Sequence, residues 1–171
     1  KLQEAEISYR KAIELKPDFA EAYCNLGVIC NSIGDPYEAI NAFKKAIQYS
    51  PDYLDAIFNL GSSLINIRKN EEGKTYLRNI LDMQLPKDKN INQNKILDIR
   101  ANTIIKLIHC LFHEGDFEST IRLLDKTPRN EYYHSYKIAC LLGLDQINNF
   151  ENEYEIICKK KICNSLIGSV V

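Results

Sequence analysis

The sequence predicts an all-α fold in which antiparallel helix pairs stack into a solenoid. Two observations predict it. The stretch 20–53 carries apolar residues at helical spacing in two blocks, with a tight turn between them. The same order of residues returns 34 positions earlier and 34 positions later. Because one such unit cannot bury its apolar face alone, the repetition predicts units that pack against each other.

The turn inside the stretch 20–53 predicts where each helix ends and begins. Gly34 suits the left-handed end of the first helix, and Asp35 suits the cap of the second. Pro36 follows at the first helical position, and Glu38 completes a capping box with Asp35. We therefore expect a helix pair joined at residues 34–35.

The packing inside the unit follows from residue size. Gly27 and Ala39 are small, so they let the two helices approach closely. Tyr23, Leu26 and Phe43 supply the bulk that fills the core between and beyond the helices.

The repeats lose regularity along the chain. We expect a half repeat over 1–19, a full repeat over 20–53 and a decayed repeat over 54–85. The decayed repeat has Arg68 where glycine is expected. The polar stretch 86–94 predicts an insertion or linker, because it interrupts the helical period.

Residues 95–171 predict degenerate helical repeats. Apolar spacing predicts a long helix over 95–114, and Gly115 with Asp116 repeats the turn chemistry of the full repeat. Further helices are expected over 117–126, 131–144 and 149–161. The half repeat at the start and the apolar tail at the end lead us to expect that the natural chain continues beyond this sequence.

The period and its key positions resemble the tetratricopeptide repeat, on these residues in order: Tyr23, Leu26, Gly27, Gly34, Ala39, Phe43, Ala46 and Pro51. The resemblance implies a right-handed superhelix. The repeats of this chain also resemble bacterial arrays like those of O-GlcNAc transferases and of proteins that fuse such repeats to an enzyme. The resemblance is strong over 1–67 and fades beyond about residue 85.

Composition excludes several functions. The 22 basic and 23 acidic residues nearly cancel, so no broad positive field favours nucleic acid or an anionic membrane. No apolar run reaches the roughly 20 residues of a membrane span. The six cysteines form no CxxC pair and predict buried free thiols in a reducing, cytoplasmic compartment: Cys24, Cys30, Cys110, Cys140, Cys158 and Cys163.

No catalytic motif, phosphate loop or cofactor fingerprint occurs, so this region is predicted to be non-catalytic and free of cofactors. His109, Cys110 and His113 share one turn and could face a metal. We prefer ordinary packed or surface side chains, because no further ligand pair has metal spacing. Cys158 and Cys163 flank three lysines, and a solvated lysine face beside packing cysteines is again the preferred interpretation.

The resemblance implies that the first helix of each repeat lines a concave groove that binds a protein or peptide. The residues predicted to contact a partner are Cys24, Asn25, Val28, Asn31, Phe58, Asn59, Ser62 and Asn66. Asn25 and Asn59 occupy one position per repeat and could hold a peptide backbone, as the asparagine ladder of O-GlcNAc transferases does. They could also bridge neighbouring helices, and this is the slightly preferred interpretation. Chaperone-type recognition of a carboxylate is disfavoured, because Cys24 and Val28 stand where cations are required.

The sequence thus favours a non-catalytic protein-interaction scaffold. One alternative is the repeat region of a larger glycosyltransferase, sulfotransferase or 2-oxoglutarate and iron oxygenase, in which it would position the substrate protein. Another is self-association through the half repeat at residues 1–16. The identity of the partner is not encoded in any motif.

Overall fold

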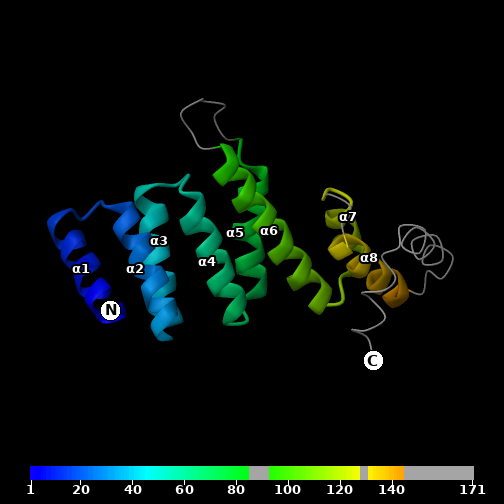
Figure 1. The fold of residues 1–171 in the computed structure, drawn as a ribbon, viewed down its shortest axis with the longest axis horizontal. Coiled ribbons are helices and arrows are strands. Elements are labelled where there is room, and N and C mark those ends of the chain that lie inside the picture. The colour runs from blue at the N-terminus through cyan, green and yellow to red at the C-terminus, as the bar shows by residue number, and fades with distance from the viewer. Residues whose placement is uncertain (85–92, 128–130, 145–171) are drawn as a thin grey trace. The chain divides into compact units, whose positions relative to one another are not determined.

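The computed structural model describes residues 1–84, 93–127 and 131–144. Within these ranges every regular element is an α-helix and no strand occurs, so the predicted all-helical array of stacked pairs is confirmed (Figure 1). The helices are α1 (Leu2–Leu15), α2 (Ala20–Ile33), α3 (Pro36–Tyr49), α4 (Leu54–Asn66), α5 (Asn70–Asp82), α6 (Gln93–His113), α7 (Phe117–Leu124) and α8 (Glu131–Gly143). The helix expected over 149–161 lies outside the described residues.

The chain divides into two compact units. The first unit is Lys1–Thr103 and the second is Ile104–Val171, so α6 begins in the first and ends in the second. In the first unit, α2 packs on α3 and α4 packs on α5, which gives the antiparallel pairs that the period predicted. α1 packs on α2, α3 packs on α4, and α2 touches α4. The first helices of successive repeats are therefore neighbours.

Three turns with one geometry end α2, α4 and α6. In the first, Gly34 has φ +89° and the Asp35 amide donates to the Cys30 carbonyl at 2.9 Å. In the last, Gly115 has φ +77° and the Asp116 amide donates to the Leu111 carbonyl at 3.0 Å. This confirms that the glycine-aspartate turn recurs in the degenerate part of the chain.

The middle turn adopts the same conformation without a glycine. Arg68 has φ +68°, and the Lys69 amide donates to the Leu64 carbonyl at 2.9 Å. A left-handed backbone places the Cβ of a non-glycine residue close to its own carbonyl oxygen. The decayed repeat thus keeps the turn and accepts backbone strain at Arg68.

The predicted capping box is correct in one half only. The Asp35 carboxylate accepts the Glu38 amide at 3.0 Å, as expected for a helix cap. The predicted return bond, from the Asp35 amide to the Glu38 carboxylate, does not form, because that amide donates to the Cys30 carbonyl. The Glu38 carboxylate instead accepts Arg10 Nη1 of α1 at 3.3 Å.

The core of the first unit has the predicted division between small and bulky residues. Leu26, Phe43 and Ala46 are buried in one cluster, and Tyr23 packs at its edge. A Cβ built at Gly27 would lie 2.5 Å from a Phe43 ring carbon, so the α2–α3 approach requires glycine there. In the next repeat Gly61 faces Leu77 in the same way, at 2.9 Å.

In the second unit, aromatic side chains join the end of α6 to α7 and α8. The Phe112 ring lies 5.6 Å from Phe117 and 5.0 Å from Tyr136, both edge-on. Tyr133 is buried beside Ile108, and its hydroxyl donates to the Asp125 carboxylate at 2.8 Å.

Candidate partner-binding face

The candidate site is the shared surface of α2 and α4, which we call the α2/α4 face. It contains Asn25, Val28, Asn31, Phe58, Asn59, Ser62 and Asn66. Asn25, Val28 and Asn31 are spaced by three residues, and Phe58, Ser62 and Asn66 by four, so each set follows one side of its helix. Asn59 lies three residues before Ser62 on the same side. A direct hydrogen bond joins the two helices across this face, from Asn31 Nδ2 to Ser63 Oγ at 2.8 Å.

The predicted contact residues differ in how far their side chains are exposed to solvent. Val28 is 42% exposed, and Asn31 and Asn66 are exposed as well. Asn25, Phe58, Asn59 and Ser62 are half-buried. The face therefore combines amide groups with the apolar surface of Val28 and Phe58.

Cys24 does not lie on this face. Its side chain is 3% exposed and belongs to the core of the first unit, which corrects the expectation that it would contact a partner. Burial raises the pKa of the Cys24 thiol, although its interactions with the side chains of Tyr53 and Asn59 oppose the rise. Cys24 is thus a packing residue beneath the α2/α4 face.

The two asparagines have different surroundings. The Asn59 side chain of α4 lies close enough to the Cys24 thiol of α2 to lower the pKa of that thiol, so it is engaged between the two helices. No such contact engages the Asn25 amide among the described residues. Asn25 is therefore the asparagine whose donors and acceptor remain open to a ligand.

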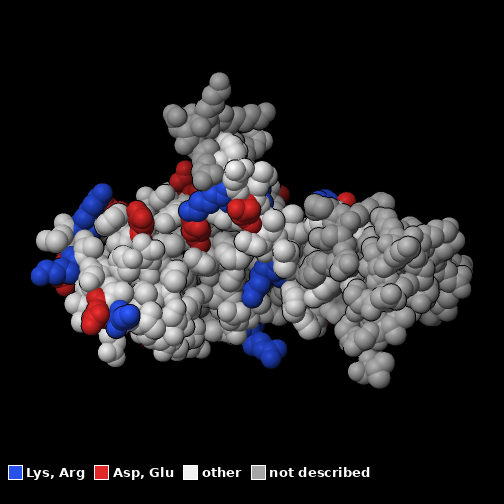
Figure 2. Space-filling model, in the orientation of Figure 1, with Lys and Arg blue, Asp and Glu red and all other residues white. Residues whose placement is uncertain are grey.

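One edge of the face is charged. The Lys95 ammonium of α6 lies 2.6 Å from the Asp55 carboxylate of α4, within the first unit. On the side of the molecule that is visible in Figure 2, basic and acidic side chains of the described residues are interspersed. That pattern gives no large field of one sign on this side of the described chain.

The histidine pair does not complete a metal site. The rings of His109 and His113 lie 4.7 Å apart, and both side chains are exposed. The Cys110 thiol is buried and donates to the Glu114 carboxylate at 3.6 Å. Among the described residues, no three His, Cys, Asp or Glu side chains are grouped to bind a metal ion.

The four cysteines of the described residues are buried free thiols, as predicted. Burial raises the pKa of Cys30, and it raises the pKa of Cys140 to about 11. Cys158 and Cys163 lie outside the described residues. No helix among those described combines the length and the apolar character that crossing a membrane requires.

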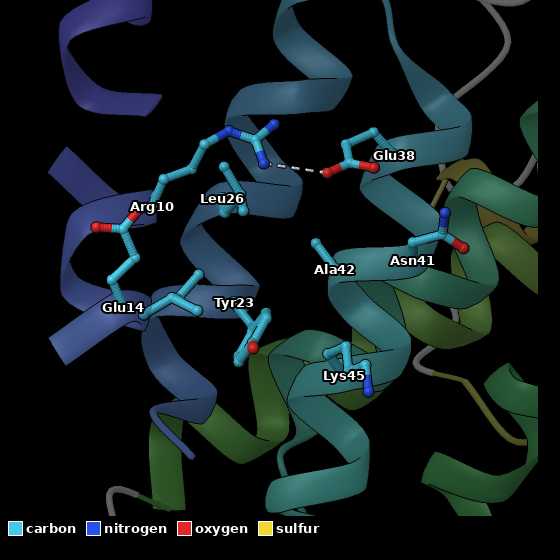
Figure 3. A pocket seen from close by; sticks show the side chains of 9 residues that line it. Arg10, Glu14, Tyr23, Leu26, Glu38, Asn41, Ala42 and Lys45 are labelled. Atoms are coloured by element: carbon cyan, nitrogen blue, oxygen red, sulfur yellow. Dashed lines mark hydrogen bonds and ion pairs between the residues drawn. The ribbon is translucent and has the colours of Figure 1, made fainter. Parts of the chain in front are cut away.

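The sequence did not predict an open pocket of about 300 Å³ that is lined by residues of α1, α2 and α3 (Figure 3). We call it the α1/α3 pocket. Its apolar lining comes from Ile13, Tyr23, Leu26 and Ala42, and its charged lining from Arg10, Glu14, Glu38 and Lys45. The signal in the sequence is Ala42, because the next repeat has the much larger Tyr76 at the same position.

Comparison with known families identifies the repeats. Residues 20–53 match the family model described as tetratricopeptide repeat, and residues 1–34 match a second model described as TPR repeat. The two matches together assign tetratricopeptide repeats to residues 1–53. The comparison with curated proteins gives no match.

Solved structures of bacterial repeat proteins share the fold. A crystal structure of MamA has a TM-score of 0.69 at 19% identity and covers 94% of this chain and 91% of its own. MamA 41-end from Desulfovibrio magneticus RS-1 gives 0.70 at 14% identity, with 96% and 88% covered. YrrB, titled a TPR protein with an unusual peptide-binding site, gives 0.66 at 19% identity, with 97% and 80% covered. At these identities the likeness concerns the fold.

Proposed function

We propose that this protein is a non-catalytic interaction scaffold that binds a peptide or an extended protein segment on the α2/α4 face. Tetratricopeptide repeats are in general protein-interaction modules, and YrrB, with the same fold, is described as having a peptide-binding site. The observation that carries the proposal is the exposed α2/α4 face, on which an open amide lies beside apolar side chains.

The chemistry of the face favours a peptide backbone as ligand. The Asn25 amide offers two donors and one acceptor, which matches the alternating carbonyl and amide groups of an extended chain. A hydrogen bond of this kind does not involve the side chains of the ligand, so it allows peptides of many sequences to bind. This is the chemistry of the asparagine ladder that O-GlcNAc transferase repeats use, here reduced to the position of Asn25 with Asn59 engaged by Cys24.

Val28 and Phe58 supply the apolar part. Val28 is 42% exposed on α2, and Phe58 is half-buried on the neighbouring α4. Apolar side chains of a ligand that cover them lose contact with water, and a partly enclosed aromatic ring contributes more than a rim residue. Sequence preference would therefore come from Phe58, and general affinity from Asn25.

The experiment selects peptides from a random phage-displayed library against the full chain and measures their affinities for three variants. Asn25→Ala should weaken every selected peptide by about 3-fold to 10-fold, as expected for one hydrogen bond. Phe58→Ala should weaken by about tenfold or more those peptides that carry a large apolar residue. Arg78→Ala on the exposed surface of α5 is the matched control and should change nothing.

Two results would contradict the proposal. Selected peptides that bind all three variants with wild-type affinity would place the binding site elsewhere on the molecule. Loss of binding in the Arg78→Ala control, at unchanged thermal stability, would move the site to the surface of α5.

A further inference from the structure

The α1/α3 pocket exists because one repeat position holds a small side chain. Ala42 of α3 lines the pocket and is 4% exposed. Thirty-four residues later the same position of α5 holds Tyr76, which is half-buried and packs against the core cluster that contains Leu60. A tyrosine ring thus packs at this repeat position in α5, whereas the preceding repeat has a hollow beside Ala42.

Several residues that surround the two positions correspond. Ile13 and Leu26 at the hollow correspond to Ile47 and Leu60 one repeat later. At the hollow, the Arg10–Glu38 ion pair at 3.3 Å lies on the pocket lining. One repeat later, Lys44 and Glu72 form the corresponding ion pair at the same distance of 3.3 Å. The chain thus contains an occupied example of the arrangement whose hollow version is the α1/α3 pocket.

The hollow has an aromatic side chain in its lining. Tyr23, on its lining, is held in place by the Tyr49 ring, whose centroid lies 5.7 Å away at an interplanar angle of 26°. A volume of about 300 Å³ falls at the lower end of the roughly 300–1,000 Å³ of ligand pockets, which suits one side chain and its neighbours. Aromatic rings bind well against such a preformed aromatic wall.

The charges around the pocket distinguish among aromatic ligands. Lys45 Nζ donates to Gln48 Oε1 at 3.2 Å, and Arg10 is paired with Glu6 and Glu38. The hydrogen bonds and ion pairs of the described residues leave the Glu14 carboxylate of α1 without a partner. An exposed carboxylate beside the pocket favours a ligand that carries a positive charge next to its ring.

We infer that the α1/α3 pocket is a second binding site, which takes one tyrosine or phenylalanine side chain of a partner peptide that has a lysine or arginine next to it. This site is separate from the α2/α4 face, because it lies between α1 and α3 and shares none of the residues of that face. A partner of this kind can engage the protein at two places.

The test titrates the full chain with p-cresol, the side chain of tyrosine, and follows backbone amide chemical shifts by NMR. The shifts should change at Ile13, Tyr23 and Ala42. Ala42→Tyr, which places the ring of the next repeat in the hollow, should abolish these changes. Its fold is checked by thermal unfolding, and Tyr76→Ala serves as the reverse variant, which should add p-cresol shifts at Ile47 and Leu60.

The charge preference is tested with two dipeptides, N-acetyl-Tyr-Lys-amide and N-acetyl-Tyr-Glu-amide. The lysine peptide should bind several-fold more tightly, and Glu14→Gln should remove the difference. Cyclohexanol, which has no aromatic ring, is the control ligand. If it shifts the same amides as strongly as p-cresol does, the preference for an aromatic ligand is overturned. Shifts that depend on protein concentration alone would assign the pocket to a second copy of the chain.

The inference is overturned if p-cresol moves no amide around the pocket, or if Ala42→Tyr leaves the shifts unchanged. Because Asn25→Ala and Phe58→Ala do not touch this pocket, they should leave p-cresol binding at the wild-type level. Failure of this inference and failure of the proposed function therefore give different results.

Discussion

Arg68 carries the clearest local strain in the described chain. It adopts a left-handed conformation at φ +68° at the repeat position that Gly34 occupies at φ +89°. A non-glycine residue in this region costs about 1–2 kcal/mol. Part of that cost is offset because glycine loses more backbone freedom on folding.

Replacing Arg68 by glycine should therefore stabilise the protein by up to about 1 kcal/mol, or about 2–4 °C in Tm. The matched control is Gly34→Ala, which should destabilise by about 1 kcal/mol. A Cβ at Gly34 meets no atom within 4 Å, so this control reports backbone strain alone. Thermal unfolding of both variants measures the effect, and a lower Tm for Arg68→Gly would contradict the strain.

Cys140 links stability to pH. Its side chain is fully buried, and burial raises the pKa of the thiol from the ordinary 9.0 to about 11. The protonated thiol therefore contributes stability that is complete below about pH 9. That contribution is lost as the pH rises from about 9 to about 11, because the unfolded chain releases its proton first.

The stability advantage of the wild type over Cys140→Ala should consequently shrink between pH 9 and pH 11. Urea unfolding at pH 8, 9.5 and 11 measures it for both proteins, and the difference cancels the ionisation of other groups. A difference that stays constant over this range would show that the thiol titrates equally in both states.

At the scale of the elements, the helix pairs depend on glycine at their closest approach. Gly27 of α2 lies against the Phe43 ring of α3, and a Cβ there would sit 2.5 Å from the ring. Overpacking of this kind typically costs 1–3 kcal/mol. The same contact in the next repeat uses the smaller Leu77 against Gly61.

Gly27→Ala should destabilise the protein by roughly 1–3 kcal/mol. The double variant with Phe43→Leu should lose less than the sum of the two single changes, because leucine relieves the clash. Chemical denaturation of the three variants completes the cycle. Additive losses would indicate that the alanine methyl does not meet Phe43.

The helix boundaries could be predicted from sequence because their signals are local. Gly34, Asp35 and Pro36 are consecutive, and their turn recurs at Gly115 and Asp116 in a region where the core positions have drifted. A left-handed glycine followed by a capping aspartate depends on few neighbours, so it survives the loss of regular packing.

The features that the sequence missed depend on contacts between repeats. Glu38 does not close the capping box, because the Asp35 amide donates to the Cys30 carbonyl and Arg10 of the preceding repeat binds the Glu38 carboxylate. Cys24 is buried in the core cluster against which Tyr53 packs, and its thiol interacts with Tyr53 at the end of its own repeat and with Asn59 of the next one. The α1/α3 pocket depends on the sizes of side chains from three helices. The residue pattern of one helix does not show how those side chains pack together.

At the scale of the whole molecule, each helix of the first unit is stabilised by its neighbours in the array. α1 has no buried residue and packs chiefly on α2. α3 buries five residues between α2 and α4: Ala39, Ile40, Ala42, Phe43 and Ala46. Stability should therefore be unevenly distributed along the array.

Amide hydrogen exchange should show α1 exchanging at least about tenfold faster than α3, which corresponds to about 1.4 kcal/mol in local opening. Mass spectrometry of peptic fragments resolves the two helices. Equal protection of α1 and α3 would show that α1 is held by contacts beyond those described.

Recognition of a partner is proposed for the α2/α4 face. The most direct measurement is NMR mapping of a library-selected peptide on the labelled full chain. We predict that the largest amide shifts occur at Asn25, Val28 and Phe58, and that those of α5 stay in place. Largest shifts on α5, with Asn25 and Phe58 unmoved, would contradict it.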